Sequence, residues 1–167
     1  MRWDEIGAQT CSIARALAEV GDRWSLLVLR EAFLRTRRFD DFVDRTGAAR
    51  NLVANRLRKL VEAGILERRR YQQRPERHEY RLTEKGLDLY PVLMGLARWG
   101  DRWHDDGGGP PVEHVHRSCR QPMYAEIVCS ECEEPLDPHD VEVRLGPGPS
   151  SATSGRTRRI GGSMRCP

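Results

Sequence analysis

The sequence predicts a mainly helical domain with one β-hairpin, followed by a small unit that carries cysteine and histidine. Three observations lead to this prediction. Apolar residues recur with a helical period over most of residues 11–103. Between residues 65 and 83 the period changes to that of two strands joined by a proline-containing link. Beyond a glycine- and proline-rich stretch at 105–111, cysteine and histidine form pairs separated by two residues.

The first half of the domain contains four predicted helices. Residues 1–10 carry no apolar period and are expected to be a flexible N-terminus. The helices follow at 11–20, 22–35, 38–46 and 48–63. Asp22 is a suitable N-cap for the second helix. Gly21, Gly47 and Gly64 stand where the first, third and fourth helices should end.

The second half of the domain contains the hairpin and one long helix. "ILERRRY" and "RHEYRLT" are predicted strands, and "QQRPE" is the tip between them. A long helix then runs from Glu84 to Trp103, and Pro91 should kink or divide it. Four helices, two strands and a final helix form the winged helix-turn-helix order, which we assign to residues 11–104. We assign 105–111 to a linker, 112–146 to a zinc-ribbon-like unit and 147–167 to a disordered tail.

Composition and charge narrow the classes of function. The chain of 167 residues is 32% charged, and no apolar run reaches the roughly 18 residues of a membrane span. The N-terminus has no apolar signal-peptide core, so we expect a cytoplasmic protein with reduced cysteines. The net charge is only +3, but residues 45–81 hold eleven Lys or Arg against four Asp or Glu. This basic segment favours a polyanionic partner, although a solvated surface would show the same charges.

Five blocks of sequence, in order, resemble the HxlR-type family of winged-helix transcription regulators, which are relatives of the MarR type. They are "CSIARALAEVGDRWSLLVLREAF", "RRFDDF", "NLVANRLRKLVEAGILERRRY", "HEYRLTEKG" and "LARWGDRW". The resemblance implies a homodimer that binds a palindromic DNA operator and represses or activates a neighbouring gene; of these we expect repression. Two positions depart from the family pattern. Cys11-Ser12 stands where the family often has Cys-Pro, and Ala48-Ala49 replaces the Ser or Thr that often caps the next helix.

The helix at 48–63 has an exposed face suited to the DNA major groove. Its first turns carry Arg50, Asn51 and Asn55, which we predict contact bases, because Arg pairs with guanine and Asn with adenine in two hydrogen bonds. Phosphate contacts are predicted for basic residues on the same helix, at the wing tip and before the third helix: Arg56, Arg58, Lys59, Arg74, Arg77, Arg37 and Arg38. The alternative is that these are solvent-facing charges with partners one helical turn away.

The last helix carries more large apolar groups than a lone helix can expose. Leu93, Leu96, Trp99 and Trp103, together with the first helix, predict a dimer interface. The alternative is that they cover the core of their own chain.

Cys11 stands at the start of the first helix, where some members of the family have a redox or electrophile sensor. A helix N-terminus stabilises a thiolate, which agrees with a sensor role for Cys11. The alternative is a buried, unreactive cysteine.

His116-x2-Cys119 and Cys129-x2-Cys132 have the spacing of two zinc knuckles, with nine residues between them. Four protein ligands leave no place for water or substrate, so the predicted Zn²⁺ is structural. His114 and His139 compete with His116 for the fourth ligand position. Arg120 departs from the glycine that commonly follows a knuckle. The alternative is four unconnected residues on a flexible segment.

These patterns favour a DNA-binding transcription regulator over an enzyme. The sequence contains no Gly-rich phosphate loop, no G-x-S-x-G elbow and no His-x-Glu deaminase knuckle. An alternative from another class is a zinc-ribbon module that docks a protein, with the winged helix as its scaffold.

Overall fold

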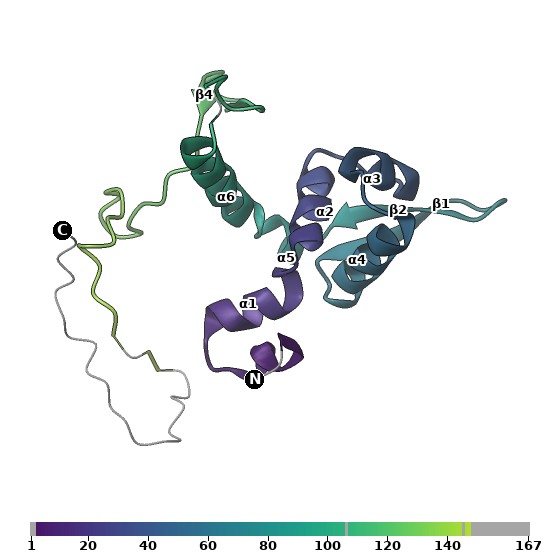
Figure 1. The fold of residues 1–167 in the computed structure, drawn as a ribbon, viewed down its shortest axis with the longest axis horizontal. Helices are drawn as coiled ribbons and strands as arrows, with labels where there is room; N and C mark the ends of the chain where they lie inside the picture. The colour runs from purple at the N-terminus through teal and green to yellow at the C-terminus, as the bar shows by residue number, and fades with distance from the viewer. Residues whose placement is uncertain (1–2, 106, 145, 148–167) are drawn as a thin grey trace.

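The computed structural model describes residues 3–105, 107–144, 146 and 147 of the chain. Its helices and strands follow the predicted order, as Figure 1 shows. They are the 3₁₀ helix η1 (Trp3–Ala8), α1 (Ser12–Val20), α2 (Arg23–Phe33), α3 (Phe39–Thr46), α4 (Arg50–Glu62), β1 (Leu66–Gln72), β2 (Arg77–Leu82), α5 (Glu84–Leu87), α6 (Tyr90–Trp103), β3 (His114–Val115) and β4 (Pro122–Met123). The predicted winged helix-turn-helix is confirmed.

The predicted capping residues fix the helices around the core. Asp22 Oδ1 accepts hydrogen bonds from the backbone N–H groups of Trp24, at 2.9 Å, and Ser25, at 3.3 Å, and so caps α2. Gly47 ends α3 with a φ of 66°, a left-handed conformation that favours glycine. It turns the chain directly into α4.

The core lies between α2, α3, α4 and the start of β1. Its largest fully buried side chains are Phe42, Leu29, Leu57, Leu60, Ile65, Leu66, Val28 and Val53. Tyr80 of β2 packs edge-on against Phe42, with 6.2 Å between the ring centroids. Because one stripe of α4 is buried in this core, the opposite face of the helix must point outward.

β1 and β2 form the wing, which projects from the helices in Figure 1. They pair antiparallel, from Leu66 opposite Leu82 to Gln72 opposite Arg77. The segment before α3 lies along β2, because the Arg37 carbonyl accepts a hydrogen bond of 2.8 Å from the Tyr80 N–H. The wing is therefore fixed to the helix-turn-helix on one edge.

Pro91 divides the predicted long helix, which was one of the two expected outcomes. α5 ends at Leu87, and α6 begins at Tyr90 with Pro91 in its first turn, where a missing N–H loses no helical hydrogen bond. The Thr83 hydroxyl caps α5 by accepting a hydrogen bond from the Gly86 N–H at 3.1 Å. α6 then leads away from the winged domain towards the C-terminal part (Figure 1).

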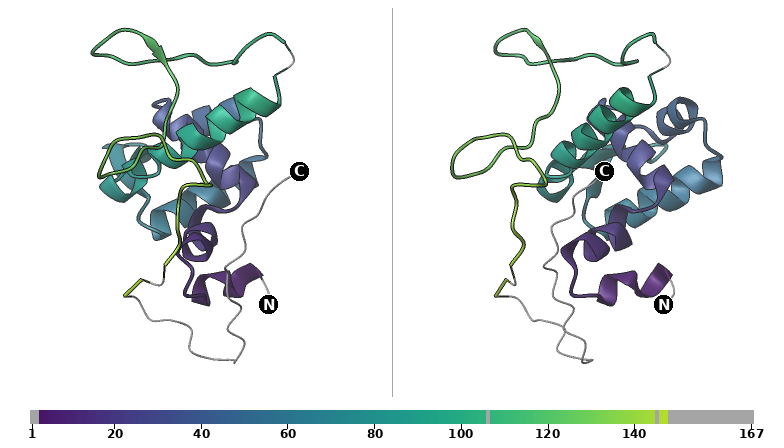
Figure 2. Two further views of the ribbon diagram at one scale, coloured as in Figure 1. Left: turned by 90° about the vertical axis from the view of Figure 1, so that its left-hand side faces the viewer. Right: turned by 60° about the vertical axis from the view of Figure 1, so that its left-hand side comes forward.

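Beyond α6 the chain forms two small hairpins. The first hairpin (residues 114–123) contains β3 and β4, which pair His114 with Met123 and Val115 with Pro122. The second hairpin (residues 127–136) has a single bridge, between Val128 and Pro135. Figure 2 shows the two hairpins apart from one another in both views. No described residue from 112 to 144 is buried.

The N-terminal residues differ from the prediction, and the predicted C-terminal tail lies outside the described residues from 148 onward. Residues 1–10 were expected to be loose, yet Trp3–Ala8 form η1, which lies beside α1. A Cβ built on Gly7 would lie 3.1 Å from the Ala18 Cβ, so η1 is in close contact with that helix. In the described part of the chain, no helix has the length and apolar character needed to cross a membrane.

Candidate nucleic-acid interface

The turn between α3 and α4 sets the direction of the candidate recognition helix. Thr46 donates its hydroxyl to the Phe42 carbonyl at 2.6 Å, and Ala48 is buried against the core. Ala49 is the N-cap of α4 and makes no side-chain hydrogen bond. The structure thus confirms that the Ala48-Ala49 pair leaves the helix without a side-chain cap.

The outer face of α4 presents half of the predicted DNA-contacting residues together. Val53, Leu57 and Leu60 are buried, and this fixes the rotation of the helix. The exposed residues on the remaining surface include the predicted contacts Arg50, Asn51, Asn55, Arg58 and Lys59. In Figure 1, α4 and the wing lie at the end of the molecule opposite α6. This arrangement leaves a helix face and a hairpin open to a partner on the same end.

Arg50 is held by two residues of α3. Its guanidinium donates a hydrogen bond of 2.8 Å to Asp40 and lies over the Phe39 ring, 4.8 Å from the centroid. Both charged side chains are largely exposed, 63% for Arg50 and 72% for Asp40. Their ion pair is therefore weak in water, and Arg50 can leave it for a stronger acceptor.

Arg56 is less exposed than the other predicted phosphate contacts on α4. Its side chain is only 17% exposed, and it donates a hydrogen bond of 3.0 Å to Asp22 Oδ2. Arg56 Nε also lies 2.9 Å from Asp22 Oδ1, close enough for an ion pair but outside hydrogen-bond geometry. Arg56 follows Val53 by three residues and precedes Leu60 by four, so it lies near the buried stripe. It joins α4 to the capped end of α2 and is less accessible to a phosphate than Arg58 or Lys59.

The other predicted phosphate contacts, apart from Arg37, are exposed. Arg58 forms an ion pair of 2.7 Å with Glu62 one turn along α4. Arg74 and Arg77 are exposed at the wing tip. Arg38 is exposed, with its guanidinium 5.3 Å from the centroid of the Tyr71 ring. Arg37 is half-buried beside β2.

Cys11 is exposed and occupies the N-cap position of α1. The alternative of a buried cysteine is therefore wrong for this residue. Arg15, the nearest cation in sequence, donates to the Ser12 hydroxyl at 3.3 Å. An oxidant can thus reach the Cys11 thiol. The sensor role of this residue stays a prediction.

The two C-terminal hairpins repeat one backbone arrangement. In the first hairpin, Arg120 N–H donates to the His116 carbonyl at 2.8 Å and His116 N–H donates to the Gln121 carbonyl at 3.0 Å. In the second, the Glu133 N–H donates to the Cys129 carbonyl at 2.9 Å and the Cys129 N–H to the Glu134 carbonyl, also at 2.9 Å.

Each hairpin also has a left-handed residue directly after its second predicted ligand. Arg120 and Glu133 both have a φ of 61°. Arg120 replaces the glycine expected at this place, and the structure gives this arginine the conformation that favours glycine. The match with Glu133 could not be found from the sequence, because neither residue type indicates a left-handed backbone.

Each hairpin brings its two predicted ligands together. His116 Nδ1 lies 3.4 Å from the Cys119 sulfur. The backbone N–H groups of Glu131 and Cys132, and then the Cys132 thiol, hydrogen bond to Cys129 and lower the pKa of that thiol from its usual value. In the described part of the chain, the two pairs do not combine into a cluster of three or more metal-binding side chains. The four predicted ligands therefore lie as two separate pairs in the described part of the chain.

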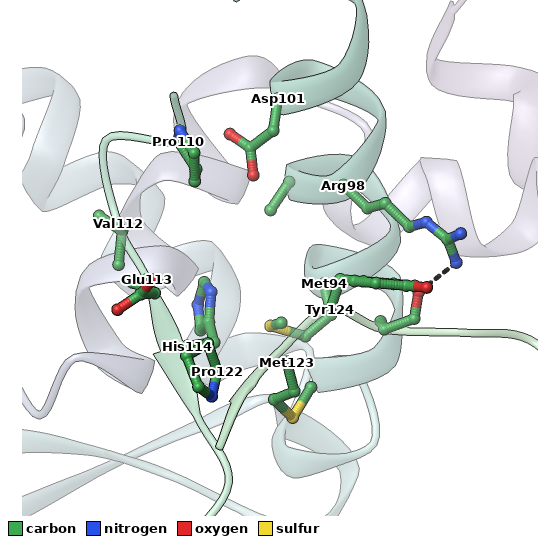
Figure 3. A pocket seen from close by; sticks show the side chains of 12 residues that line it. Met94, Arg98, Asp101, Pro110, Val112, Glu113, His114, Pro122, Met123 and Tyr124 are labelled. Carbon is green, nitrogen blue, oxygen red and sulfur yellow. Dashed lines mark hydrogen bonds between the residues drawn. The ribbon is translucent and has the colours of Figure 1, made fainter. Parts of the chain in front are cut away.

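The competing histidines lie elsewhere. His114 lines a cavity of about 210 Å³ between α6 and the first hairpin, which Figure 3 shows together with Met94 and Asp101. His139 is exposed, and its N–H donates to Asp137 at 2.8 Å. The cavity is smaller than the roughly 300–1,000 Å³ of an ordinary small-molecule site.

A helix-turn-helix with a flanking hairpin and an exposed basic recognition helix defines a class of DNA-binding proteins. Residues 19–107 match the family of HxlR-like helix-turn-helix proteins, and the chain belongs to this family. The uncharacterized HTH-type transcriptional regulator Rv3095 of Mycobacterium tuberculosis is 42% identical over 137 residues, which are 82% of this chain and 87% of that protein.

Two solved structures extend the comparison. PA1607, a candidate transcription factor, matches with a TM-score of 0.75 and 33% identity over 84% of this chain and 98% of that one. The redox regulator HypR in its oxidised form matches with a TM-score of 0.52 and 28% identity over 55% of this chain and 96% of that one. The chain is thus a transcriptional regulator with a helix-turn-helix DNA-binding domain, and its family does not consist of enzymes.

Proposed function

We propose that the protein binds a palindromic operator as a homodimer and represses the neighbouring gene. The observation that carries this proposal is the outer face of α4, where Arg50, Asn51 and Asn55 are exposed in the first turns. In helix-turn-helix docking these turns enter the major groove and contact base edges. Arg58, Lys59 and the wing-tip residues Arg74 and Arg77 then lie where phosphates would flank the groove.

A dimer is supported by an apolar stripe on α6. Val92, Leu96, Trp99 and Trp103 follow one another at spacings of four, three and four residues, and all four are about half exposed or more. Ile13 of α1 is 70% exposed as well. The spacing is that of a helix–helix seam, and a second subunit is the simplest cover for it. Leu93, which the sequence suggested for this interface, packs against the core of its own chain instead.

Two-fold symmetry links the dimer to the operator. A dimer presents two copies of α4 related by a two-fold axis, so it matches two half-sites in inverted order. Repression would follow if the occupied operator overlaps the site where transcription starts.

The experiment that tests the interface is a binding assay with the double variant Arg50→Ala, Asn51→Ala on an operator selected from random DNA. Each lost base contact should reduce affinity roughly 10- to 100-fold and relax preference at its base pair. Arg144→Ala is the matched control, because Arg144 is exposed and ion-paired with Glu142 in the C-terminal part. Affinity and sequence preference that remain those of the wild type in the double variant would reject this interface.

We propose that oxidation of Cys11 weakens operator binding. The redox regulator HypR shares the fold of this chain, and here Cys11 is exposed at the start of α1, next to the exposed Ile13. A modified thiol at that place would disturb the dimer and hence the spacing of the two recognition helices. If Cys11→Ser still releases DNA on treatment with an oxidant or quinone, this proposal is wrong.

We propose that the C-terminal hairpins bind structural Zn²⁺ through His116, Cys119, Cys129 and Cys132. Tetrahedral zinc, with bonds of about 2.0 Å to nitrogen and 2.3 Å to sulfur, separates the two donor atoms by about 3.5 Å. The observed 3.4 Å between His116 Nδ1 and the Cys119 sulfur fits this value.

The backbone of the hairpins supports the same proposal. A non-glycine residue in the left-handed region costs roughly 1–2 kcal/mol, and the hairpins bury too little apolar surface to offset it at Arg120 and Glu133. Metal–ligand bonds would supply that free energy.

Metal analysis of the purified protein tests the zinc proposal. We expect about one Zn²⁺ per subunit, lost in Cys129→Ser and kept in the control Cys11→Ser. A wild-type protein that is free of zinc would refute it. The alternative function, a protein-docking module, would instead show Zn²⁺ together with DNA affinity that does not fall with added salt.

A further inference from the structure

The two halves of the metal site lie on two flanks of α6. The first hairpin borders Met94, Ala97 and Asp101, and the cavity between them is the one in Figure 3. The second hairpin borders Gly95, Trp99 and Trp103 across another open space of about 370 Å³. Arg98 lies between the two flanks and lines both spaces.

Arg98 fixes the segment that joins the hairpins. Its guanidinium donates a hydrogen bond of 2.7 Å to the Ala125 carbonyl and lies over the Tyr124 ring, 4.3 Å from the centroid. Figure 3 shows this bond at the point where the chain crosses α6. With this crossing in place, His116 and Cys119 do not form one metal-binding cluster with Cys129 and Cys132 among the described residues.

The second hairpin lies next to the surface assigned to the dimer. Trp99 and Trp103 line the open space beside it and belong to the exposed stripe of α6. A second subunit that covers this stripe therefore comes close to the second hairpin, which carries Cys129 and Cys132. The open space between the stripe and Ile127, Pro135 and Leu136 of that hairpin is not filled by the described part of the chain.

We propose that the zinc site is completed between subunits: His116 and Cys119 of one chain bind the same Zn²⁺ as Cys129 and Cys132 of the other. This inference rests on the proposed dimer and the proposed zinc ligands. In a two-fold dimer the first hairpin of each chain meets the second hairpin of the other, so two sites of this kind form together. Each site has three thiolates and one imidazole, a common donor set for structural zinc, and each binding event releases thiol protons.

This arrangement uses both hairpins and leaves the Arg98 crossing intact. It also joins the dimer through metal bonds in addition to the apolar stripe. Zinc then stabilises the spacing of the two recognition helices, although it lies on a part of the chain that does not contact DNA.

The test uses two variants that each keep one half of the site. One is His116→Ala, Cys119→Ser, and the other is Cys129→Ser, Cys132→Ser. They are co-expressed with different affinity tags, and the mixed dimer is isolated by selecting both tags in turn. Zinc is measured after dialysis against a mild chelator, and circular dichroism checks that the winged domain of each variant is folded.

We expect the mixed dimer of the two variants to bind zinc that neither variant binds alone. Each variant alone should hold almost none, while the mixed dimer should hold about one Zn²⁺ per dimer, half the wild-type amount. A mixed dimer without zinc, beside a wild type with about one per subunit, would place the whole site within one chain and overturn the inference. Zinc retained by the first variant alone would also overturn it, because the second hairpins would then pair with each other. A zinc-free wild type would instead refute the underlying zinc proposal.

Discussion

The winged domain and the C-terminal hairpins are built from similar local turns, but they are held together by different interactions. The winged domain has side chains such as Phe42, Leu29 and Leu57 that are fully buried. The hairpins have backbone hydrogen bonds of 2.8–3.0 Å and no buried residue among those described. Apolar burial can therefore explain the fold of the first region and cannot explain that of the second. The comparison indicates that a short segment with ordered turns and no core needs a ligand or a partner.

Removal of zinc by a chelator should produce the largest difference in stability between the two regions. Structural zinc contributes about 10–16 kcal/mol in small zinc domains, more than any single contact in the chain. We expect a strong chelator to remove the hydrogen-exchange protection of the His116 and Cys129 amides, which are bonded within the hairpins. The Leu57 amide, in the core helix α4, should change far less. Equal protection of the Cys129 amide before and after chelation would contradict this difference.

A core truncation should have the next largest effect. Leu57→Ala removes a side chain with 0% exposure and should lower the free energy of unfolding by about 2–5 kcal/mol. Leu136→Ala in the second hairpin, where the side chain is 48% exposed, should change it by less than about 0.5 kcal/mol. Urea denaturation followed by circular dichroism measures both. Similar losses in the two variants would show that the hairpin has a core of its own.

Two glycines within residues 11–104 test how closely the elements of the winged domain pack. A Cβ at Gly86 would overlap the Ile65 carbonyl, so Gly86→Ala should cost roughly 1–3 kcal/mol in thermal or urea unfolding. Gly100→Ala in α6 is the control, because a Cβ added there would point into open space. The control should be neutral or stabilise the helix by up to about 1 kcal/mol. A neutral Gly86→Ala would show that α5 moves freely against β1.

Arg56 and Arg58 lie two residues apart on α4. Substitution of Arg56 should lower fold stability, whereas substitution of Arg58 should lower the salt dependence of DNA binding. Arg56→Ala should destabilise the fold by roughly 1–2 kcal/mol, because it removes the hydrogen bond to Asp22. Arg58→Ala should change stability by less than about 0.5 kcal/mol but lower the salt dependence of DNA binding by about one phosphate contact. Salt titrations of DNA affinity measure the second effect. A reduced slope in the Arg56 variant would show that this residue reaches a phosphate after all.

The sequence was sufficient for the order of elements because caps, glycines and apolar periods are local. Asp22, Gly47 and Pro91 each act within one turn of their own position, and each was placed correctly. The basic character of Arg56 predicts a phosphate contact, although its position relative to Val53 and Leu60 indicates the less exposed side of the helix. The spatial separation of the two predicted ligand pairs could not be predicted, because it depends on how the chain crosses α6. No local pattern records that crossing.

The pair between Arg50 and Asp40 has a consequence for how the protein would search along DNA. With the proposed guanine contact, Arg50 would keep its carboxylate partner on a sequence without a suitable guanine, so an encounter with the wrong site would gain little from this residue. Asp40 would then act as an internal competitor that a guanine must displace, and the dwell time on random DNA would stay short. Asp40→Asn should lengthen that dwell time and narrow the ratio between operator and random-sequence affinity, which single-molecule sliding and competition assays can measure. An unchanged ratio in that variant would mean that the carboxylate does not compete with the bases.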